Sequence, residues 1–143
     1  MSIIYIASDH GGFNLKTSLV EHLKSKGHEV HDLGPSDPSS CDYPVKAQAV
    51  TDALLKNDEA LGILVCGTGI GMSMAANRVP GIRAAVCTNE FHAAYCRAHN
   101  NANIICLGER VSGPGIAANM VDIFLATEFE GGRHLRRINM FDK

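Results

Sequence analysis

Leu61-Gly62-Ile63-Leu64-Val65-Cys66-Gly67-Thr68-Gly69-Ile70-Gly71 joins a predicted buried strand to a glycine-rich turn. Residues 61–65 are continuously apolar, which is typical of a parallel strand that is covered on both faces of its sheet. The alternate glycines that follow permit a tight turn, and a short helix through about Asn77 is expected after it. This strand–turn–helix unit predicts an α/β fold.

Four further strands and their helices are expected on either side of this unit. Apolar or β-rich runs predict strands at 3–7, 29–33, 82–86 and 103–107. Helical spacing, start signals and stop signals predict helices over 11–26, from 42–44 onward, over 89–97 and over 114–129. Their alternation indicates right-handed βαβ units. The predicted fold class is α/β, a three-layer α/β/α Rossmann-like domain with a five-stranded parallel sheet, in one domain over residues 1–143.

Composition narrows the function classes. The net charge of −2 gives no electrostatic reason to expect nucleic acid or a membrane surface as a partner. No apolar run approaches the roughly 20 residues of a membrane helix, and the start of the chain lacks the basic flank and cleavage site of a signal peptide. We therefore expect a cytoplasmic protein. Its five cysteines have no paired spacing and are expected to be free thiols.

The turn at 67–71 is the first candidate for chemistry. Its backbone N–H groups are expected to converge on one point and, with the following helix, to favour negative charge. The same environment favours a thiolate at Cys66, which is then a candidate base or nucleophile. A tight turn without a ligand and a buried structural thiol are the alternatives. The GxGxG spacing after the third strand argues against a dinucleotide site, and the lack of a following Gly-Lys-Ser/Thr argues against a P-loop.

Two histidines are further candidates. Asp9 and His10 follow the first strand and suit proton transfer, or else Asp9 caps a helix and His10 faces solvent. His99 ends a predicted helix, where it is either an acid/base or a surface residue that complements the helix dipole. Cys96 with His99 supplies too few ligands for zinc. The sequence therefore predicts no metal site.

A basic stretch closes the sequence. Residues 131–143 are expected to form a basic tail or a short helix, in which Arg133 and Arg137 share one face. Two guanidinium groups on one face match a phosphate, although a solvated tail is the alternative. The glycine pair at 131–132 is expected to let this stretch fold back, which would bring the base, the anion hole and the phosphate anchor to the same edge of the sheet.

Several short motifs, taken together and in order, carry a family resemblance that runs nearly end to end. The chain resembles the family of type B ribose-5-phosphate isomerases, which also holds galactose-6-phosphate isomerase subunits. The motifs are Ser8-Asp9-His10-Gly11-Gly12, Asp42-Tyr43-Pro44, Cys66-Gly67-Thr68-Gly69-Ile70-Gly71, Ala75-Ala76-Asn77 with Gly81-Ile82-Arg83-Ala84, His99-Asn100, Gly108-Glu109-Arg110-Val111 and Glu130-Gly131-Gly132-Arg133-His134.

The resemblance implies an aldose–ketose isomerase without cofactor or metal, which interconverts ribose 5-phosphate and ribulose 5-phosphate through an enediolate. It implies that Cys66 is the base, as in the cysteine branch of the family, which has no Glu at the position of Met72. It further implies an anion hole formed by Gly67, Thr68, Gly69, Ile70 and Gly71, with Thr68 also shuttling the hydroxyl proton. His99 would open the sugar ring, with Asp9 near the ring oxygen. The phosphate would be bound by His10, Arg133 and Arg137, and Tyr43 would line the sugar pocket.

The same resemblance implies a homodimer with sites shared between subunits, in which Asn100 and Arg110 reach the ligand of the neighbouring subunit. A tetramer stays open as a further assembly. Two other functions also stay open. One is the same chemistry on a hexose 6-phosphate, such as allose or galactose 6-phosphate. The other is a non-catalytic nucleotide-binding module.

Overall fold

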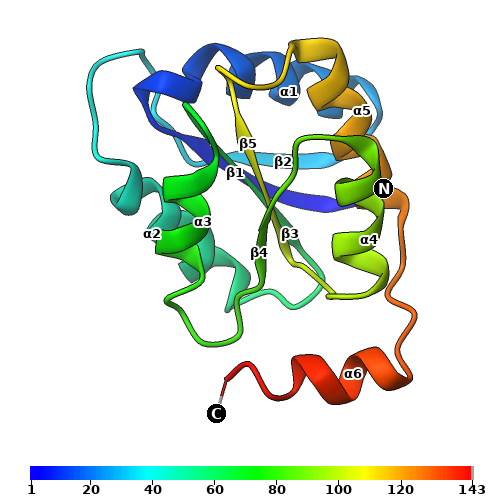
Figure 1. Ribbon diagram of the computed structural model, residues 1–143. Helices are drawn as coiled ribbons and strands as arrows, with labels where there is room; N and C mark the ends of the chain where they lie inside the picture. The colour runs from blue at the N-terminus through cyan, green and yellow to red at the C-terminus, as the bar shows by residue number, and fades with distance from the viewer. Residues whose placement is uncertain (143) are drawn as a thin grey trace.

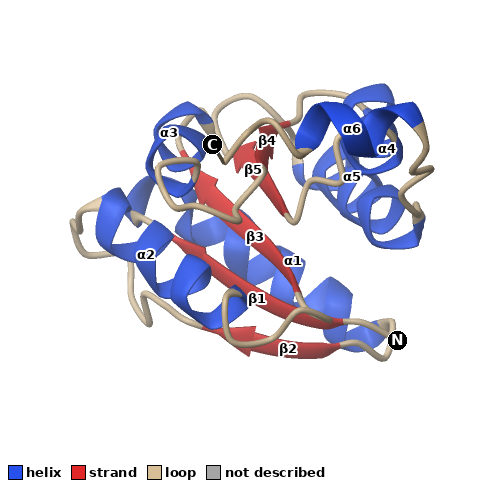
Figure 2. Ribbon diagram, turned by 90° about the horizontal axis from the view of Figure 1, so that it is seen from below, coloured by secondary structure: helices blue, strands red, loops and turns tan. Residues whose placement is uncertain are grey.

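The computed structural model describes residues 1–142 and contains one parallel sheet between two helical layers (Figures 1 and 2). The strand order is β2-β1-β3-β5-β4, and every neighbouring pair is parallel. The strands are β1 (Ile3–Ser8), β2 (Glu29–Asp32), β3 (Leu61–Cys66), β4 (Ala84–Val86) and β5 (Ile104–Gly108). The helices are α1 (Phe13–Ser25), α2 (Tyr43–Leu54), α3 (Ile70–Ala76), α4 (Glu90–Ala98), α5 (Pro114–Ala126) and α6 (Arg133–Ile138). The predicted α/β class and five-stranded parallel sheet are confirmed.

Several element boundaries differ from the predicted ranges by one to three residues, and the local structure explains two of these differences. β4 begins at Ala84 rather than at residue 82, because the backbone N–H of Arg83 donates to the side chain of Asn103 instead of joining the strand ladder. α5 ends at Ala126 rather than near residue 129. Thr127 there is already extended, with φ −93° and ψ 128°.

Side chains from the two faces of the sheet form two separate cores. On one face α1, α4 and α5 pack against alternate residues of β3, including Ile63 and Val65. On the other face α2 and α3 pack against Leu64 and against Cys106 of β5. β3 is therefore buried from both sides, as its continuous apolar run predicted, and its last residue is held in a fixed place.

The exposed edge of β4 is blocked by one side chain. The amide of Asn77, just after α3, donates to the carbonyl of Ala84 and accepts from its N–H, both at 2.8 Å. This pair occupies backbone groups that an edge strand would otherwise offer to another chain. It also ties the end of α3 to the sheet.

The basic stretch forms a helix beyond the amino ends of β4 and β5. Figure 1 shows α6 below the sheet, at the opposite end from the start of α3. Two hydrogen bonds fix this position: the Glu130 N–H donates to the Ala98 carbonyl at 3.0 Å, and the Gly81 N–H donates to the Asp142 side-chain carboxylate at 3.0 Å. Among the described residues, no helix has both the length and the apolar character to cross a bilayer.

Candidate active site

The strand order places a topological switch point between the carboxyl ends of β1 and β3, and we call this place at the edge of the sheet the crevice. From β1 the chain passes outward to β2 and then returns to β3 on the other side, so the two crossovers diverge at this point. Open α/β sheets bind ligands at such a position. Asp9 follows β1 and donates its N–H to the Val65 carbonyl at 3.2 Å, while Cys66 ends β3. The predicted cluster at this edge is confirmed.

The backbone of the glycine turn donates to the thiol of Cys66. The Gly69 N–H lies 3.1 Å from the Cys66 sulfur, in the geometry of a hydrogen bond. Gly69 has φ +82°, a left-handed conformation that side chains disfavour, so glycine is required for this donor to turn inward. Cys66 is only 5% exposed. The loop therefore aims a backbone donor at a sulfur that is nearly buried at the end of β3.

The loop rests directly on the end of β5, which fixes its position. A Cβ atom added to Gly108 would lie 2.6 Å from the Thr68 carbonyl carbon, so only a glycine leaves room for the loop backbone. The Thr68 hydroxyl accepts a hydrogen bond from the Ile70 N–H at 3.2 Å, and Thr68 is exposed at the crevice mouth. Contacts within the chain therefore hold the loop in place.

Three other predicted residues lie around this crevice. The Tyr43 ring covers Gly71, where an added Cβ would meet ring atoms at 2.9 Å. The Arg110 guanidinium lies against Gly67 of the same chain. His10 is exposed, and its Nδ1 accepts from the Cys41 N–H at 3.3 Å. We define the carboxyl half-site as Asp9, His10, Tyr43, Cys66, Gly67, Thr68, Gly69, Ile70, Gly71 and Arg110.

Asp9 has a structural partner within this half-site. Its Oδ1 accepts from the Gly12 N–H at 3.1 Å and so caps the 3₁₀ turn His10–Gly12. The capping alternative is therefore confirmed for Asp9, which is nearly buried.

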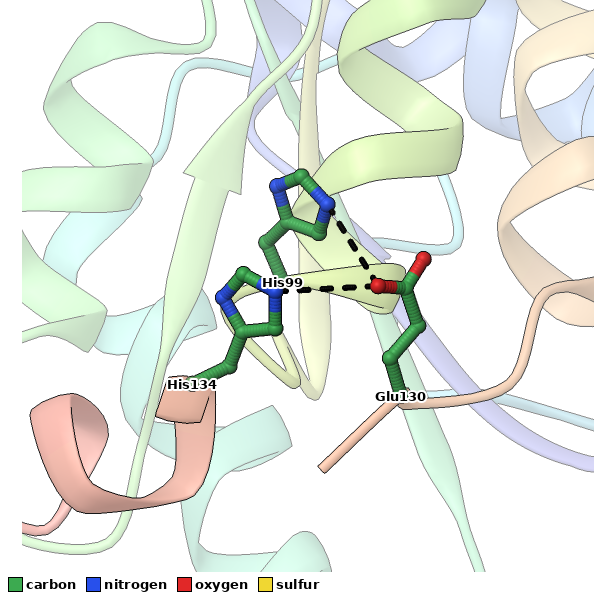
Figure 3. Close-up of side chains that lie close together, drawn as sticks. All are labelled: His99, Glu130 and His134. Atoms are coloured by element: carbon green, nitrogen blue, oxygen red, sulfur yellow. Dashed lines mark ion pairs between the residues drawn. The ribbon is translucent and has the colours of Figure 1, made fainter. Parts of the chain in front are cut away.

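The remaining predicted residues lie together elsewhere, and we define them as the amino half-site: His99, Asn100, Arg133 and Arg137. His99 ends α4, and its ring stacks on that of His134 with centroids 4.2 Å apart. Tyr95 contacts the His99 ring edge-on at 4.8 Å. Figure 3 shows both imidazoles turned toward the carboxylate of Glu130.

The amino half-site is at the opposite edge of the sheet from Cys66. α4 runs back from the carboxyl end of β4, so its last turn and His99 precede β5. β5 and β3 are paired in register from Gly62↔Ile104 to Cys66↔Gly108, so His99 and Cys66 are separated by about the length of a strand. β3 has six residues, and at a rise of ~3.3 Å per residue its length is roughly 20 Å. The prediction that the arginines fold over the Cys66 edge of their own chain is wrong.

Electrostatics also differ at this second edge. Arg133 and Arg137 are exposed on α6, and neither forms an ion pair within residues 1–142. Burial, followed by the charges of His99 and Arg133, lowers the pKa of His134. His134 and Glu130 received no role from the sequence, although they belong to one of the quoted motifs. Their spacing around the glycine pair gave no sign that they would meet His99.

Comparison with known proteins identifies the family of this arrangement. The Ribose/Galactose Isomerase family matches residues 4–141. The chain belongs to this family. It is 43% identical over 138 residues to ribose-5-phosphate isomerase B of Escherichia coli, covering 96% of this chain and 93% of the relative.

Solved structures of the Ribose/Galactose Isomerase family superimpose on nearly the whole chain. A ribose 5-phosphate isomerase of Thermotoga maritima has a TM-score of 0.97 and 50% identity, covering 99% of this chain and 97% of the other. Ribose-5-phosphate isomerase B of Mycoplasma genitalium, solved with bound ribulose-5-phosphate, has a TM-score of 0.93 and 50% identity, covering 96% and 91%.

Proposed function

We propose that this protein is an aldose–ketose isomerase that interconverts ribose 5-phosphate and ribulose 5-phosphate through an enediolate. The observation that carries the proposal is the Cys66 sulfur at the crevice with the Gly69 N–H 3.1 Å away. Enediolate chemistry needs a base close to backbone donors, because negative charge develops on a substrate oxygen as the proton leaves carbon. The family relationship and the ribulose-5-phosphate complex of the M. genitalium relative support the same substrate pair.

In this proposal the carboxyl half-site performs the carbon chemistry. The Cys66 thiolate takes the proton from C2 of the open-chain aldose and returns it to C1. The N–H groups of the loop at 67–71 stabilise the enediolate oxygen, and the Thr68 hydroxyl passes the proton between the two substrate oxygens. Asp9 lies near the ring oxygen and Tyr43 forms the pocket wall.

The amino half-site opens the sugar ring and holds the phosphate. His99 exchanges a proton with the ring oxygen, a role that suits an imidazole near neutral pH. Arg133 and Arg137 lie four residues apart on α6. They bind the phosphate together with His10, which belongs to the carboxyl half-site. Asn100 contributes a polar contact to the same ligand.

The separation of the half-sites leads us to propose a homodimer in which each complete site combines both edges. The amino half-site of one chain faces the carboxyl half-site of its partner. Exposed apolar side chains supply a surface for this contact, with Ile70 and Met74 on α3 at 51% and 67% exposure and Phe91 on α4 at 66%. Arg110 covers Gly67 of its own chain, so in this dimer Arg110 belongs to the same site as the Cys66 of its own chain. Asn100 of the partner subunit completes that site. A tetramer of such dimers stays open.

The proposal also includes the domain boundaries and the cellular compartment of the protein. Residues 1–143 form one isomerase domain, which the family match over 4–141 supports. The protein is cytoplasmic, which its five free thiols support, because reduced cysteines persist in that compartment.

The test is an isomerase assay with Cys66→Ala on a panel of pentose and hexose phosphates. We expect turnover of ribose 5-phosphate to fall by at least about 10³-fold, because the base is lost, while KM changes little. Cys41→Ala is the matched control and should keep wild-type kcat, since Cys41 donates its backbone N–H to His10 and alanine keeps that donor.

Three outcomes would contradict the proposal. Near-wild-type kcat in Cys66→Ala would exclude this thiol as the base. A higher kcat/KM on a hexose 6-phosphate would make the protein a hexose-phosphate isomerase. Nucleotide binding without turnover of any sugar phosphate would indicate the non-catalytic module.

A further inference from the structure

Three side chains at the amino half-site form a cluster that the proposed isomerisation does not fully use. His99, Glu130 and His134 place one possible ligand atom each within 4.8 Å of one another. They come from the end of α4, from the segment before the glycine pair and from the first turn of α6 (Figure 3). Two imidazoles and one carboxylate are a ligand set used by zinc and related transition metals.

One ring nitrogen of His134 has no hydrogen-bond partner among the described residues. His134 is 8% exposed, and its buried Nε2 atom has no hydrogen-bond partner among the described residues. The nearest charged atom is Glu130 Oε1 at 3.6 Å, which is too long for a hydrogen bond. A buried ring nitrogen without a partner is costly, so a group bridging this gap would be stabilising.

The spacing of the three atoms suits a small bridging ion. Glu130 Oε1 lies 3.7 Å from His99 Nε2 and 3.6 Å from His134 Nε2. Ligand atoms around tetrahedral zinc lie ~3.4 Å apart, given zinc–ligand distances of about 2.0–2.1 Å. The Glu130 oxygen is therefore within a few tenths of an ångström of this spacing from each ring. The two imidazole nitrogens are within 4.8 Å of each other, so they must approach by up to about 1.4 Å, which requires both rings to turn out of their stack. Glu130 is exposed and followed by two glycines, so this adjustment is open to it.

Charge limits the affinity without preventing binding. Arg133 and Arg137 lie near His134 and oppose a cation, while Glu130 supplies the only carboxylate of the described cluster. We therefore expect binding in the micromolar range rather than at the tightness of a structural zinc site.

We propose that His99, Glu130 and His134 bind one divalent transition metal ion, best matched by Zn²⁺, with water as a fourth ligand. The bound ion takes the Nε2 lone pair of His99, so that this imidazole no longer exchanges a proton with the substrate. The site is therefore inhibitory. This last consequence rests on the proposed function, whereas the binding itself does not.

Direct binding is measured by titrating Zn²⁺ into the protein in competition with a chromophoric chelator, and by the visible spectrum of the Co²⁺ form. We expect one site per chain, with tetrahedral Co²⁺ bands and without the thiolate charge-transfer band that a cysteine ligand would give. Glu130→Gln and His134→Asn should each weaken binding by at least about tenfold, the loss that even outer-shell partners of metal sites produce. Glu130 is exposed, so its variant is expected to fold.

The chain offers a matched control in a second histidine–carboxylate pair. His22 Nε2 on α1 lies 2.8 Å from Asp122 Oδ1 on α5. Among the described residues, no third histidine, cysteine or carboxylate completes a metal-binding group with this pair. His22→Asn should leave the affinity unchanged. Equal affinity in wild type, Glu130→Gln and His134→Asn, or a thiolate band in the Co²⁺ spectrum, would overturn the site.

Activity separates inhibition at His99 from other effects. Ribose 5-phosphate closes to a furanose, whereas ribulose 5-phosphate cannot, because its C5 hydroxyl is esterified. At saturating substrate, Zn²⁺ should therefore lower kcat from ribose 5-phosphate more than kcat from ribulose 5-phosphate, and Glu130→Gln should shift the inhibition to higher Zn²⁺. An equal loss of kcat in both directions would overturn the assignment of the inhibition to ring opening by His99. A metal-free protein without turnover in either direction would refute the proposed function and leave the binding result standing.

Discussion

The carboxyl half-site and the amino half-site are built in different ways. The first consists largely of backbone, since Cys66 ends a buried strand and its loop is pressed against β5 at Gly108. The second consists of side chains at helix ends, carried by the last turn of α4 and by the six-residue helix α6. One is fixed by the sheet, and the other is placed by a glycine pair with φ +70° and +58°.

This difference matches the work that each half is proposed to perform. Proton transfer between two carbons tolerates little displacement, because a shift of 1 Å can cost about 10²-fold in rate. A phosphate held by two long arginines tolerates more, since their side chains adjust. A rigid half that carries the base can therefore be completed by a more adaptable half from another chain.

The strongest test of the comparison is to inactivate each half on a different chain. Cys66→Ala removes the base from the carboxyl half, and Arg137→Ala removes a phosphate ligand from the amino half. If sites are shared, a mixed dimer of the two variants has one site with both residues intact. Unfolding, mixing and refolding equal amounts should then restore about a quarter of wild-type activity, because about half of the dimers are mixed and each has one working site.

A pair of variants from the same half provides the control for this experiment. His99→Asn and Arg137→Ala both damage the amino half, so no mixed dimer of these two contains an intact site. Their mixture should show no gain over the separate variants. Activity that fails to return in the Cys66→Ala and Arg137→Ala mixture, although mixed dimers form, would place the whole site in one chain.

A smaller effect is expected from crowding the carboxyl half alone. Gly108→Ala places a Cβ 2.6 Å from the Thr68 backbone, so the loop must move. We expect a loss of about 1–3 kcal/mol in the free energy of unfolding, as for other overpacked positions, and a fall in kcat that exceeds any change in KM. Thermal unfolding and steady-state kinetics measure the two effects.

Gly115, in the first turn of α5, is the matched glycine for this test. No atom lies within 4 Å of an added Cβ there, so Gly115→Ala should be neutral or stabilise by up to about 1 kcal/mol through helix propensity. If Gly108→Ala behaves like Gly115→Ala, backbone contact with β5 does not hold the loop in place.

The sequence predicted the carboxyl half-site well, because strong local signals determine it. The apolar run of β3 has one compatible environment, and the rule that ligands bind beyond parallel strand ends then places Asp9 and Cys66 together. The caps and glycines of this edge act within a few residues of one another. Periodicity and turn chemistry therefore sufficed.

The amino half-site was misplaced because nothing local determines the path of its last segment. Gly131 and Gly132 have positive φ angles, which glycine adopts as readily as negative ones. The presence of the pair therefore did not indicate the direction that the chain takes after it. The position of α6 depends instead on contacts far apart in the sequence, such as Glu130 with Ala98 and Asp142 with Gly81. Only the position of His99 could have been predicted correctly from the sequence. A helix that leads into a parallel strand ends at the amino edge of the sheet, and His99 lies at the end of such a helix.

The smallest expected effect is a pH response confined to the amino edge. His28 precedes β2, and its Nδ1 accepts from the Ser2 N–H at 2.9 Å beside the start of β1. Burial, and then the charged N-terminus, lower its pKa below the ordinary 6.5. The folded protein therefore disfavours protonated His28. Its contribution to stability is present above pH 6.5 and is lost as the pH falls below that value.

Thermal unfolding of wild type and His28→Gln between about pH 7.5 and about pH 5.5 checks this sign. Wild type should lose more in Tm than the variant does, because only wild type must protonate a ring nitrogen that already accepts a hydrogen bond. The Cys66 edge has no part in this linkage, so the difference should persist in a Cys66→Ala background. A larger loss in His28→Gln, or a difference that disappears with Cys66, would mean that the two edges of the sheet do not respond independently.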